Sequence, residues 1–254
     1  MNITIIGTGN VATVLGKVFL KGKHTILQVA GRREELLNAL SNVLQCPYTL
    51  SYKNINQQSD IYIIAVSDKA IESILSEIII PDESIIVHTA GGVSVKVFED
   101  KFKNYGVLYP LQSLRKENNH LPEIPFFIDA NNEITKKNLY DFAKTVSDKV
   151  FFADDDKRLK LHIAAVLTSN FTNFLYSLAD DFCAKENIDF KNLLPLMHET
   201  IDRLQQFHPS EMQTGPAFRK DLLTVERHLN ILKRYPQIHD VYEFLSNCIM
   251  SVEQ

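Results

Sequence analysis

The chain has 254 residues, of which 45% are hydrophobic and 23% are charged, and its net charge is −4. This is the composition of a globular protein without the basic surplus of a nucleic-acid binder, and no apolar run reaches the roughly 18 residues that a membrane span needs. Its three cysteines are widely spaced and no leader-like segment opens the chain, so we expect reduced thiols and a cytoplasmic protein.

The first 152 residues alternate short β-rich runs with helical runs. Strands are predicted at 2–6, 26–30, 61–66, 84–88, 105–109, 125–129 and 150–152, with a less regular one near 48–50, and helices at 10–21, 33–43, 69–79 and 134–147. The run 61–66 is apolar throughout, which is typical of a parallel strand covered on both faces. We therefore predict a doubly wound α/β domain with a mostly parallel sheet over residues 1–152.

After residue 152 the β-rich runs stop, and residues 153–254 predict an all-α domain. A long helix is expected at 157–187, where the chain has no Gly or Pro, followed by helices at 190–207, 217–234 and 238–252. The long helix is apolar around most of its circumference, through Leu161, Ala164, Ala165, Leu167, Phe171, Phe174, Leu175 and Leu178. Such a helix favours a homodimer formed through residues 153–254; a monomer whose shorter helices wrap the long one is the alternative.

The first predicted strand leads directly into a GxGxxA motif that begins a predicted helix: Gly7, Thr8, Gly9, Asn10, Val11 and Ala12. In this context the first glycine permits a tight turn, the second lets a pyrophosphate approach the backbone, and the small third residue lets the helix pack on the sheet. The helix N-terminus adds free N–H groups and a positive dipole end. The motif predicts the dinucleotide site of a Rossmann domain; a βα turn without a ligand is the alternative.

The end of the second strand indicates which dinucleotide binds. NAD-binding domains usually carry an acidic residue there, which bonds to the ribose 2′-hydroxyl. This chain has Gly31, Arg32 and Arg33 instead. Two guanidinium groups suit a 2′-phosphate, so we predict NADP(H) as the cofactor rather than NAD(H). A surface ion pair with Glu34 or Glu35 is the competing interpretation.

Further cofactor contacts are expected where later strands end. Ala65, Val66 and Ser67 would line the crevice for the adenosine ribose and pyrophosphate, and Thr89, Ala90 and Gly91 would approach the nicotinamide ribose. Asp68 is expected to cap helix 69–79. Beyond the strand at 105–109, Gln112 and Ser113 either bond to the local backbone or face the substrate.

Catalytic candidates lie on the long helix. On an ideal helix Arg158, His162, Ser169 and Asn173 share a stripe about 60° wide, and Asn170 is about 80° from His162. We expect this stripe to be buried. A histidine beside hydroxyl and amide groups can protonate and orient a carbonyl or imine, although a core histidine with satisfied hydrogen bonds is equally compatible.

A break at residues 214–216 precedes Arg219, which could bind a substrate carboxylate at the free N-terminus of the next helix, or only tie two helices together through Asp221. The histidines and carboxylates show no ligand spacing, so no metal site is predicted.

The chain as a whole resembles the Rossmann-like proteins with a DUF2520-type C-terminal domain, NADP oxidoreductases related to the pyrroline-5-carboxylate reductase and 6-phosphogluconate dehydrogenase superfamily. The segments that carry the resemblance are 7–12, 65–68, 88–92, 109–113, 162–166, 169–170 and 214–219. It implies a helical second domain that often mediates dimerisation and an active site between the domains. Two features depart from the pattern: Tyr109 stands where many relatives have His, and the Lys-x-x-x-Asn pair of the hydroxyacid dehydrogenases is absent.

We therefore expect a reductase or dehydrogenase that transfers hydride between NADP(H) and a small carbonyl or imine compound, with His162, Ser169, Asn170 and Arg219 as catalytic candidates. A non-catalytic NADP-binding sensor or scaffold is the alternative, because a fold alone does not establish an activity.

Overall fold

The computed structural model describes residues 1–118 and 120–252. It divides into two compact units, Met1–Ser169 and Asn170–Gln254, hereafter unit 1 and unit 2. Unit 1 contains an eight-stranded sheet of β1 (Asn2–Ile6), β2 (Thr25–Ala30), β3 (Tyr48–Thr49), β4 (Ile61–Ile64), β5 (Ile85–His88), β6 (Asn104–Pro110), β7 (Phe126–Ala130) and β8 (Val150–Phe152). Every predicted strand is therefore present.

The strand order in this sheet is β3-β2-β1-β4-β5-β6-β7-β8. All neighbouring strands are parallel except β6 and β7, which run antiparallel. The chain moves outward in one direction from β1 to β3 and then crosses back to β4, so the strand order reverses between β1 and β4. Ligands of doubly wound folds bind beyond the carboxyl ends of the strands at such a reversal. The predicted fold class is confirmed.

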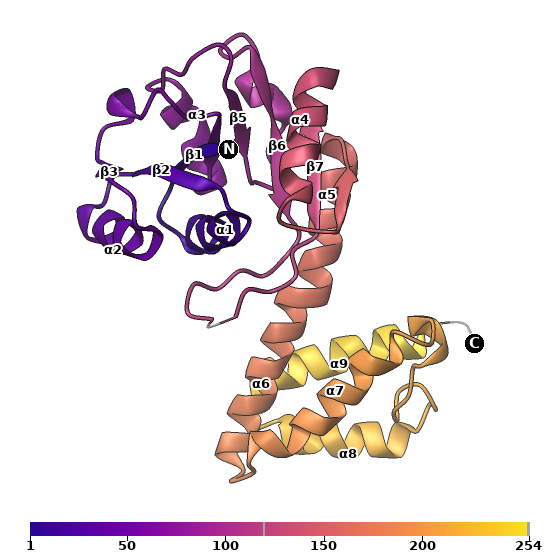
Figure 1. Cartoon of the computed structure of the whole chain (residues 1–254). Helices are drawn as coiled ribbons and strands as arrows, with labels where there is room; N and C mark the ends of the chain where they lie inside the picture. Colours follow the sequence, from indigo (N-terminus) through magenta and orange to yellow (C-terminus); the bar gives the residue numbers. More distant parts are fainter. Residues whose placement is uncertain (119, 253–254) are drawn as a thin grey trace. The chain divides into compact units, whose positions relative to one another are not determined.

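Helices and short turns cover both faces of the sheet (Figure 1). On one face α1 (Asn10–Lys21), α2 (Glu34–Leu44) and α4 (Glu133–Lys144) bury apolar side chains against the strands. The other face is covered by α3 (Ile71–Leu75) and by 3-10 turns at Tyr52–Asn54 and Val95–Phe98. Burial on both faces explains why the central strands are apolar at nearly every position.

The predicted helix at 69–79 is wrong in its extent. A 3-10 turn occupies Asp68–Ala70 and only Ile71–Leu75 are α-helical. Ile78 and Ile80 both pack on the sheet while Ile79 is 72% exposed, an alternation that an extended segment produces and a helix does not. The capping role predicted for Asp68 is also wrong, because Asp68 lies inside the 3-10 turn and Ala70 precedes the helix.

The predicted helix at 157–187 is interrupted. It consists of α5 (Asp155–Ala165), a π-helical segment at Val166–Phe171 and α6 (Thr172–Lys185). A π-helix has a wider turn than an α-helix, so a stripe drawn at 100° per residue does not continue through it. The predicted buried stripe is wrong: Arg158 is 1% exposed, but His162, Ser169, Asn170 and Asn173 are all exposed.

Unit 2 contains α6, α7 (Leu194–Arg203), α8 (Leu222–Leu232) and α9 (Pro236–Met250), with 3-10 turns at Phe190–Leu193 and Pro209–Glu211. No strand occurs in the described part of the chain after Phe152, as predicted. The predicted helices at 190–207 and 217–234 are shorter in the structure. The strands end at the predicted boundary, whereas the compact units divide after Ser169, since α5 packs on β6 and β7 through Leu161.

The core of unit 1 encloses a histidine at the end of β5. His88 is fully buried, its ring stacks on Phe98 at a centroid distance of 5.5 Å, and its Nδ1 accepts a hydrogen bond from the Ala90 N–H at 3.2 Å. Burial lowers the pKa of His88 from 6.5 to about 4, and the nearby charge of Arg158 contributes in the same direction. His88 is therefore neutral in the folded protein at neutral pH.

This lowered pKa makes the stability of unit 1 depend on pH. Between about pH 6.5 and pH 4 the unfolded chain protonates His88 while the folded chain does not, so acidification favours unfolding, by about 3 kcal/mol if the whole shift is realised. In denaturant unfolding across this pH range, His88→Leu should lose a large part of the wild-type pH dependence. The exposed-site control His198→Leu should retain it; equal slopes for His88→Leu and wild type would contradict the prediction.

Candidate cofactor and active site

The turn between β1 and α1 has the geometry of a dinucleotide-binding loop. Gly7 has a φ of +127°, and a Cβ there would lie 2.1 Å from the carbonyl oxygen of Ala65, so no other residue fits. Gly9 caps α1 without a side-chain hydrogen bond, and a Cβ at Gly9 would meet no atom within 4 Å. The first turn of α1 carries no acidic residue. These features fit a pyrophosphate at the helix N-terminus.

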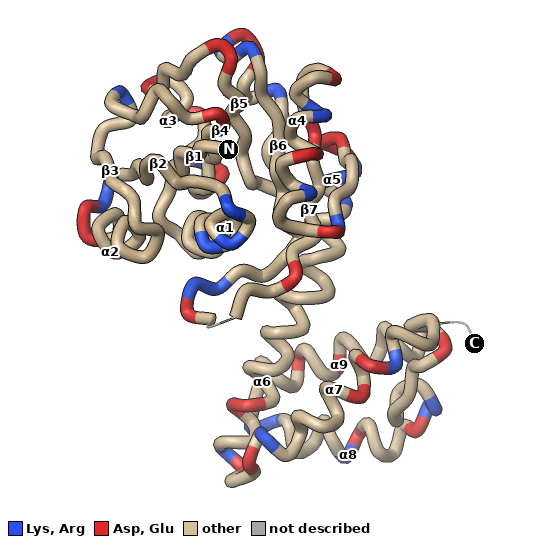
Figure 2. The backbone as a smooth tube through the Cα atoms, in the orientation of Figure 1, with Lys and Arg blue, Asp and Glu red and all other residues tan. Residues whose placement is uncertain are grey.

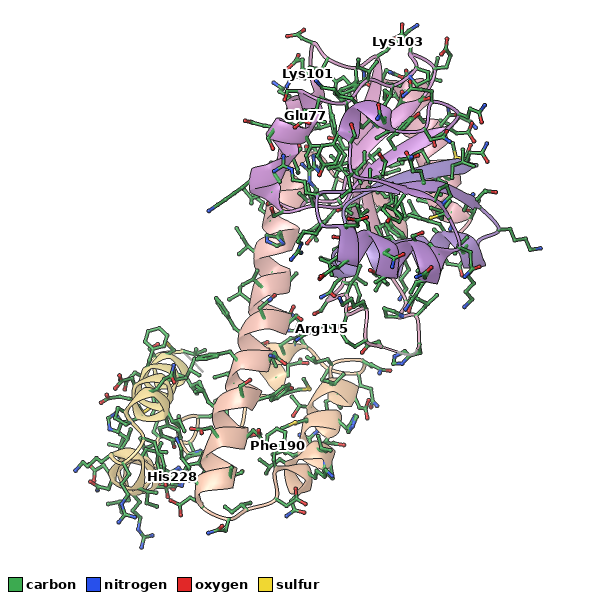
Figure 3. The ribbon with its side chains drawn as sticks, turned by 90° about the vertical axis from the view of Figure 1, so that its left-hand side faces the viewer. Glu77, Lys101, Lys103, Arg115, Phe190 and His228 are labelled. Atoms are coloured by element: carbon green, nitrogen blue, oxygen red, sulfur yellow. The ribbon has the colours of Figure 1, made fainter. Side chains whose placement is uncertain are left out.

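The end of β2 lies beside this turn. A Cβ on Gly31 would be 3.3 Å from Cγ2 of Thr8, so the two segments are in contact. Arg32 is 61% exposed at its side chain, and its guanidinium lies 5.8 Å from the centre of the Tyr52 ring. Its ion-pair partner at 3.9 Å is Glu77, which follows α3 and is labelled in Figure 3.

Arg32 does not pair with Glu34 or Glu35, which was the competing interpretation of its charge. Arg33 precedes α2 and forms no ion pair with any residue in the described ranges. Both guanidinium groups are thus exposed next to the turn, and of the two only Arg32 has an ion-pair partner in the part of the chain that the structure describes.

The ends of β4 and β5 complete this edge of the sheet. Ala65 is buried and its N–H donates to the carbonyl of Ile6 at 2.7 Å, while Val66 is half-buried and Ser67 exposed. The Thr89 N–H donates to the carbonyl of Ile64 at 3.2 Å. The segments predicted to contact the cofactor therefore meet at the same edge, at residues 7–12, 31–33, 65–67 and 89–91.

His162 lies at this edge through two contacts within unit 1. Its Nδ1 is 3.1 Å from Oη of Tyr109, a buried residue near the end of β6. A Cβ on Gly91 would be 2.9 Å from both Cγ and Nδ1 of His162, so the imidazole lies directly on the backbone that follows β5. An exposed acid–base group is thereby held beside the segment expected to approach the nicotinamide ribose.

Arg158 and Asp155 hold α5 to residues 93–95, the segment that follows β5. The sequence analysis gave neither residue this positioning role. Nη2 of Arg158 lies 2.5 Å from the carbonyl oxygen of Val93 and 2.5 Å from Oδ1 of Asp155. Asp155 also accepts hydrogen bonds from the Val95 N–H, at 3.0 Å, and from the Ser94 hydroxyl.

Burial alone would raise the pKa of Asp155, but the hydrogen bonds from Ser94, Val95 and Arg158, with the Arg158 charge, bring it below its usual range. The carboxylate is therefore ionised and able to pair with Arg158. Its spacing of three residues from Arg158 in the first turn of a helix was the available sequence signal.

The other predicted site residues are not gathered around His162 within unit 1. Ser169 ends unit 1 and Asn170 begins unit 2, both in the π-helical segment. Arg219 lies in the turn before α8, and the predicted free N-terminus there is wrong, because the Asp221 side chain caps α8 by accepting from the Thr224 N–H at 3.1 Å.

Gln112 and Ser113 bond locally: Gln112 donates to the carbonyl of Glu123 at 2.9 Å and accepts from the Ser113 N–H. Of their two predicted roles, the structure supports the bonding to local backbone.

The distribution of charges and of possible metal ligands adds little to the description of the candidate site. Lys and Arg are interspersed with Asp and Glu along both units (Figure 2). Across residues 1–118 and 120–252, no three His, Cys, Asp or Glu side chains gather in a metal-binding arrangement. None of the helices in these ranges is long and apolar enough to span a membrane.

Two known protein families match this chain. Residues 2–92 match the family described as "NADP oxidoreductase coenzyme F420-dependent", and residues 124–249 match the family described as "Domain of unknown function (DUF2520)". No curated protein matches the sequence. A Bacteroides fragilis structure titled "putative NADP oxidoreductase BF3122" is 36% identical, with a TM-score of 0.92, and the match covers 99% of this chain and 98% of that one.

More distant structures share the fold. The 1-pyrroline-5-carboxylate reductase of Streptococcus pyogenes is 15% identical with a TM-score of 0.65, and the match covers 99% of both chains. A reductive aminase of Aspergillus terreus, in complex with NADPH and ethyl-5-oxohexanoate, is 15% identical with a TM-score of 0.73, over 98% of this chain and 92% of that one.

The fold and the β1–α1 turn define an NADP-dependent oxidoreductase built on a Rossmann domain with a helical C-terminal half. More particularly, the chain belongs to the family of NADP oxidoreductases that carry a DUF2520 domain. The predicted family, cofactor and enzyme class are confirmed.

The positions of Arg32 and Arg33 predict how the cofactor is selected. Replacing both by alanine should weaken NADPH binding by about 1.5–4 kcal/mol and hardly change NADH binding, because only NADPH has a 2′-phosphate to pair with them. Calorimetric titration with both cofactors measures the difference. Lys101→Ala with Lys103→Ala, at two exposed positions before the amino end of β6, is the charge-matched control. Equal losses for NADPH and NADH in the arginine variant would contradict the assignment.

Proposed function

We propose that this oxidoreductase reduces a small carbonyl or imine compound with NADPH. The observation that carries the proposal is the imidazole of His162, exposed to solvent, hydrogen-bonded to Tyr109 and seated on Gly91 at the edge where the cofactor segments meet. The similarly folded reductive aminase and pyrroline-5-carboxylate reductase support the carbonyl and imine classes by their names.

The proposed roles divide between binding and proton transfer. Residues 7–12 would hold the pyrophosphate, Arg32 and Arg33 the 2′-phosphate, and residues 65–67 and 89–91 the two ribose groups. The bound cofactor supplies hydride, and His162 would protonate and orient the heteroatom of the substrate. Ser169 and Asn170 stand in a π-helical segment, a feature frequent at functional sites, and with Arg219 they are proposed to orient the substrate.

A substitution at His162 tests this function directly. His162→Asn should lower the rate of NADPH oxidation, with a panel of small aldehydes, ketones and cyclic imines, by about 100-fold, because proton transfer from a positioned side chain contributes that much. NADPH affinity, measured by thermal shift, should be unchanged. The control His198→Asn, on the exposed surface of α7, should leave both unchanged.

An unchanged rate in His162→Asn would contradict the proposed role of this residue. Wild-type protein that binds NADPH tightly but oxidises it with no member of the panel would favour the alternative of a cofactor-binding sensor or scaffold.

We also propose that the protein is a cytoplasmic homodimer that binds a small molecule and no nucleic acid. Cys46 and Cys183 are buried as free thiols, which suits a reducing compartment. Large apolar side chains are exposed along α5, the π-helical segment and α6: Leu159 46%, Ile163 53%, Leu167 56%, Phe171 55% and Phe174 44%. A second subunit covering residues 153–254 would remove this apolar surface from water.

Light scattering at micromolar concentration should give twice the monomer mass of 29.0 kDa. Phe171→Glu should shift the mass toward the monomer, because it places a charge among apolar side chains that the interface would bury. Ile134→Glu, at an equally apolar and 76% exposed position on α4, should not. A monomeric mass for the wild type would overturn the proposed dimer.

A further inference from the structure

Tyr109 is a buried phenol whose single polar atom is directed at His162. The residue is 7% exposed and pairs across the sheet with Phe127, in a cluster with Val107 and Ala153. Its ring meets that of His162 edge-on, at a centroid distance of 6.1 Å and an angle of 76°. The hydrogen bond between Oη and Nδ1, at 3.1 Å, is therefore formed at the boundary between the core and the exposed imidazole.

Burial raises the pKa of the Tyr109 phenol, so Oη keeps its proton at neutral pH. With the imidazole proton on Nε2, Oη donates to Nδ1; with the proton on Nδ1, Oη accepts. A neutral imidazole that accepts at Nδ1 carries its own proton on Nε2. No residue of the described ranges bonds to Nε2, and His162 is exposed. In the first arrangement His162 therefore presents an N–H donor on its exposed side.

Gly91 keeps the imidazole in this orientation. Because a Cβ at Gly91 would lie 2.9 Å from Nδ1 and Cγ of His162, the ring rests on bare backbone on one side and on Tyr109 at one edge. These contacts leave little freedom to rotate, so in that arrangement the direction in which Nε2–H points is fixed as well.

Arg158 supplies the electrostatic partner of the phenol. Its side chain is 1% exposed, and its Nε and Nη1 are buried without a hydrogen-bond partner among the described residues. The positive charge of Arg158 lowers the pKa of Tyr109 and so opposes the effect of burial. This charge would partly offset the cost that burial imposes on a phenolate at Tyr109.

We propose that Tyr109 is the positioning residue of His162 and the source that restores its proton during reduction, an inference that rests on the proposed function. As the substrate carbon receives the hydride with its electron pair, the Nε2–H bond breaks and an O–H or N–H bond forms on the heteroatom. Nδ1 takes the proton of Oη, which leaves a neutral imidazole and a phenolate that the positive charge of Arg158 partly stabilises. A proton from solvent then restores the phenol.

The spectroscopic test requires no substrate. In 15N-labelled full-length protein, long-range proton–nitrogen spectra of the imidazole rings should show neutral His162 as the Nε2–H tautomer, with the signal assigned by His162→Gln. Tyr109→Phe keeps the ring and removes the donor, so His162 should shift toward a mixture of tautomers. The chain provides a matched control: Tyr242→Phe removes a similar bond to Nδ1 of His228, 2.7 Å long, in unit 2 (Figure 3), and should change His228 alone.

The kinetic test uses the compound that NADPH oxidation identifies as a substrate. Tyr109→Phe should lower kcat by about tenfold or more and leave the KM for NADPH unchanged, since the step affected is proton transfer and not cofactor binding. A His162 spectrum that is identical in wild type and Tyr109→Phe overturns the positioning role. A tautomer shift with an unchanged kcat overturns the restoring role. A wild type without any turnover overturns the proposed function and the restoring role together, while the spectra still judge the positioning role separately.

Discussion

The ion pair between the buried Arg158 and the half-buried Asp155 is the interaction on which the candidate site depends. It joins the first turn of α5 to residues 93–95, the segment that follows β5. The Arg158 side chain is 1% exposed, and a buried charge is costly unless it is paired and hydrogen-bonded. The pair therefore fixes α5 on the sheet, and only then can His162, one turn further along the helix, meet both Gly91 and Tyr109.

The cofactor-binding part of the candidate site depends instead on the absence of side chains at two glycines. At Gly7 the backbone passes so close to Ala65 that no Cβ fits, and at Gly9 the space outside the helix N-terminus stays open. The parallel order of β2, β1, β4, β5 and β6 then brings every strand end that matters to one edge. The glycines of the β1–α1 turn and the buried charge of Arg158 on α5 together place the cofactor-binding and proton-transfer groups at the same edge of the sheet.

The sequence predicted best what depends on local pattern and context. The strands, the cofactor turn and the family followed from apolar runs, from a GxGxxA motif between a strand and a helix, and from short segments spread along the chain. The π-helical segment at Val166–Phe171 could not be predicted, since its residues have ordinary helical character. The predicted stripe does not continue through the wider turn to Ser169 and Asn173, and His162, which precedes that turn, is exposed as well. The partnership of Tyr109 with His162 joins residues far apart in sequence and required the fold.

The most direct measurement of the central claim is a crystal structure of the protein with NADPH bound. The account predicts the pyrophosphate at the N-terminus of α1, the 2′-phosphate beside Arg32 with Glu77 displaced from it, and the nicotinamide ring next to Gly91, within reach of a substrate that contacts Nε2 of His162. A nicotinamide bound away from Gly91, with His162 turned from Tyr109 and facing no part of the cofactor edge, would contradict it.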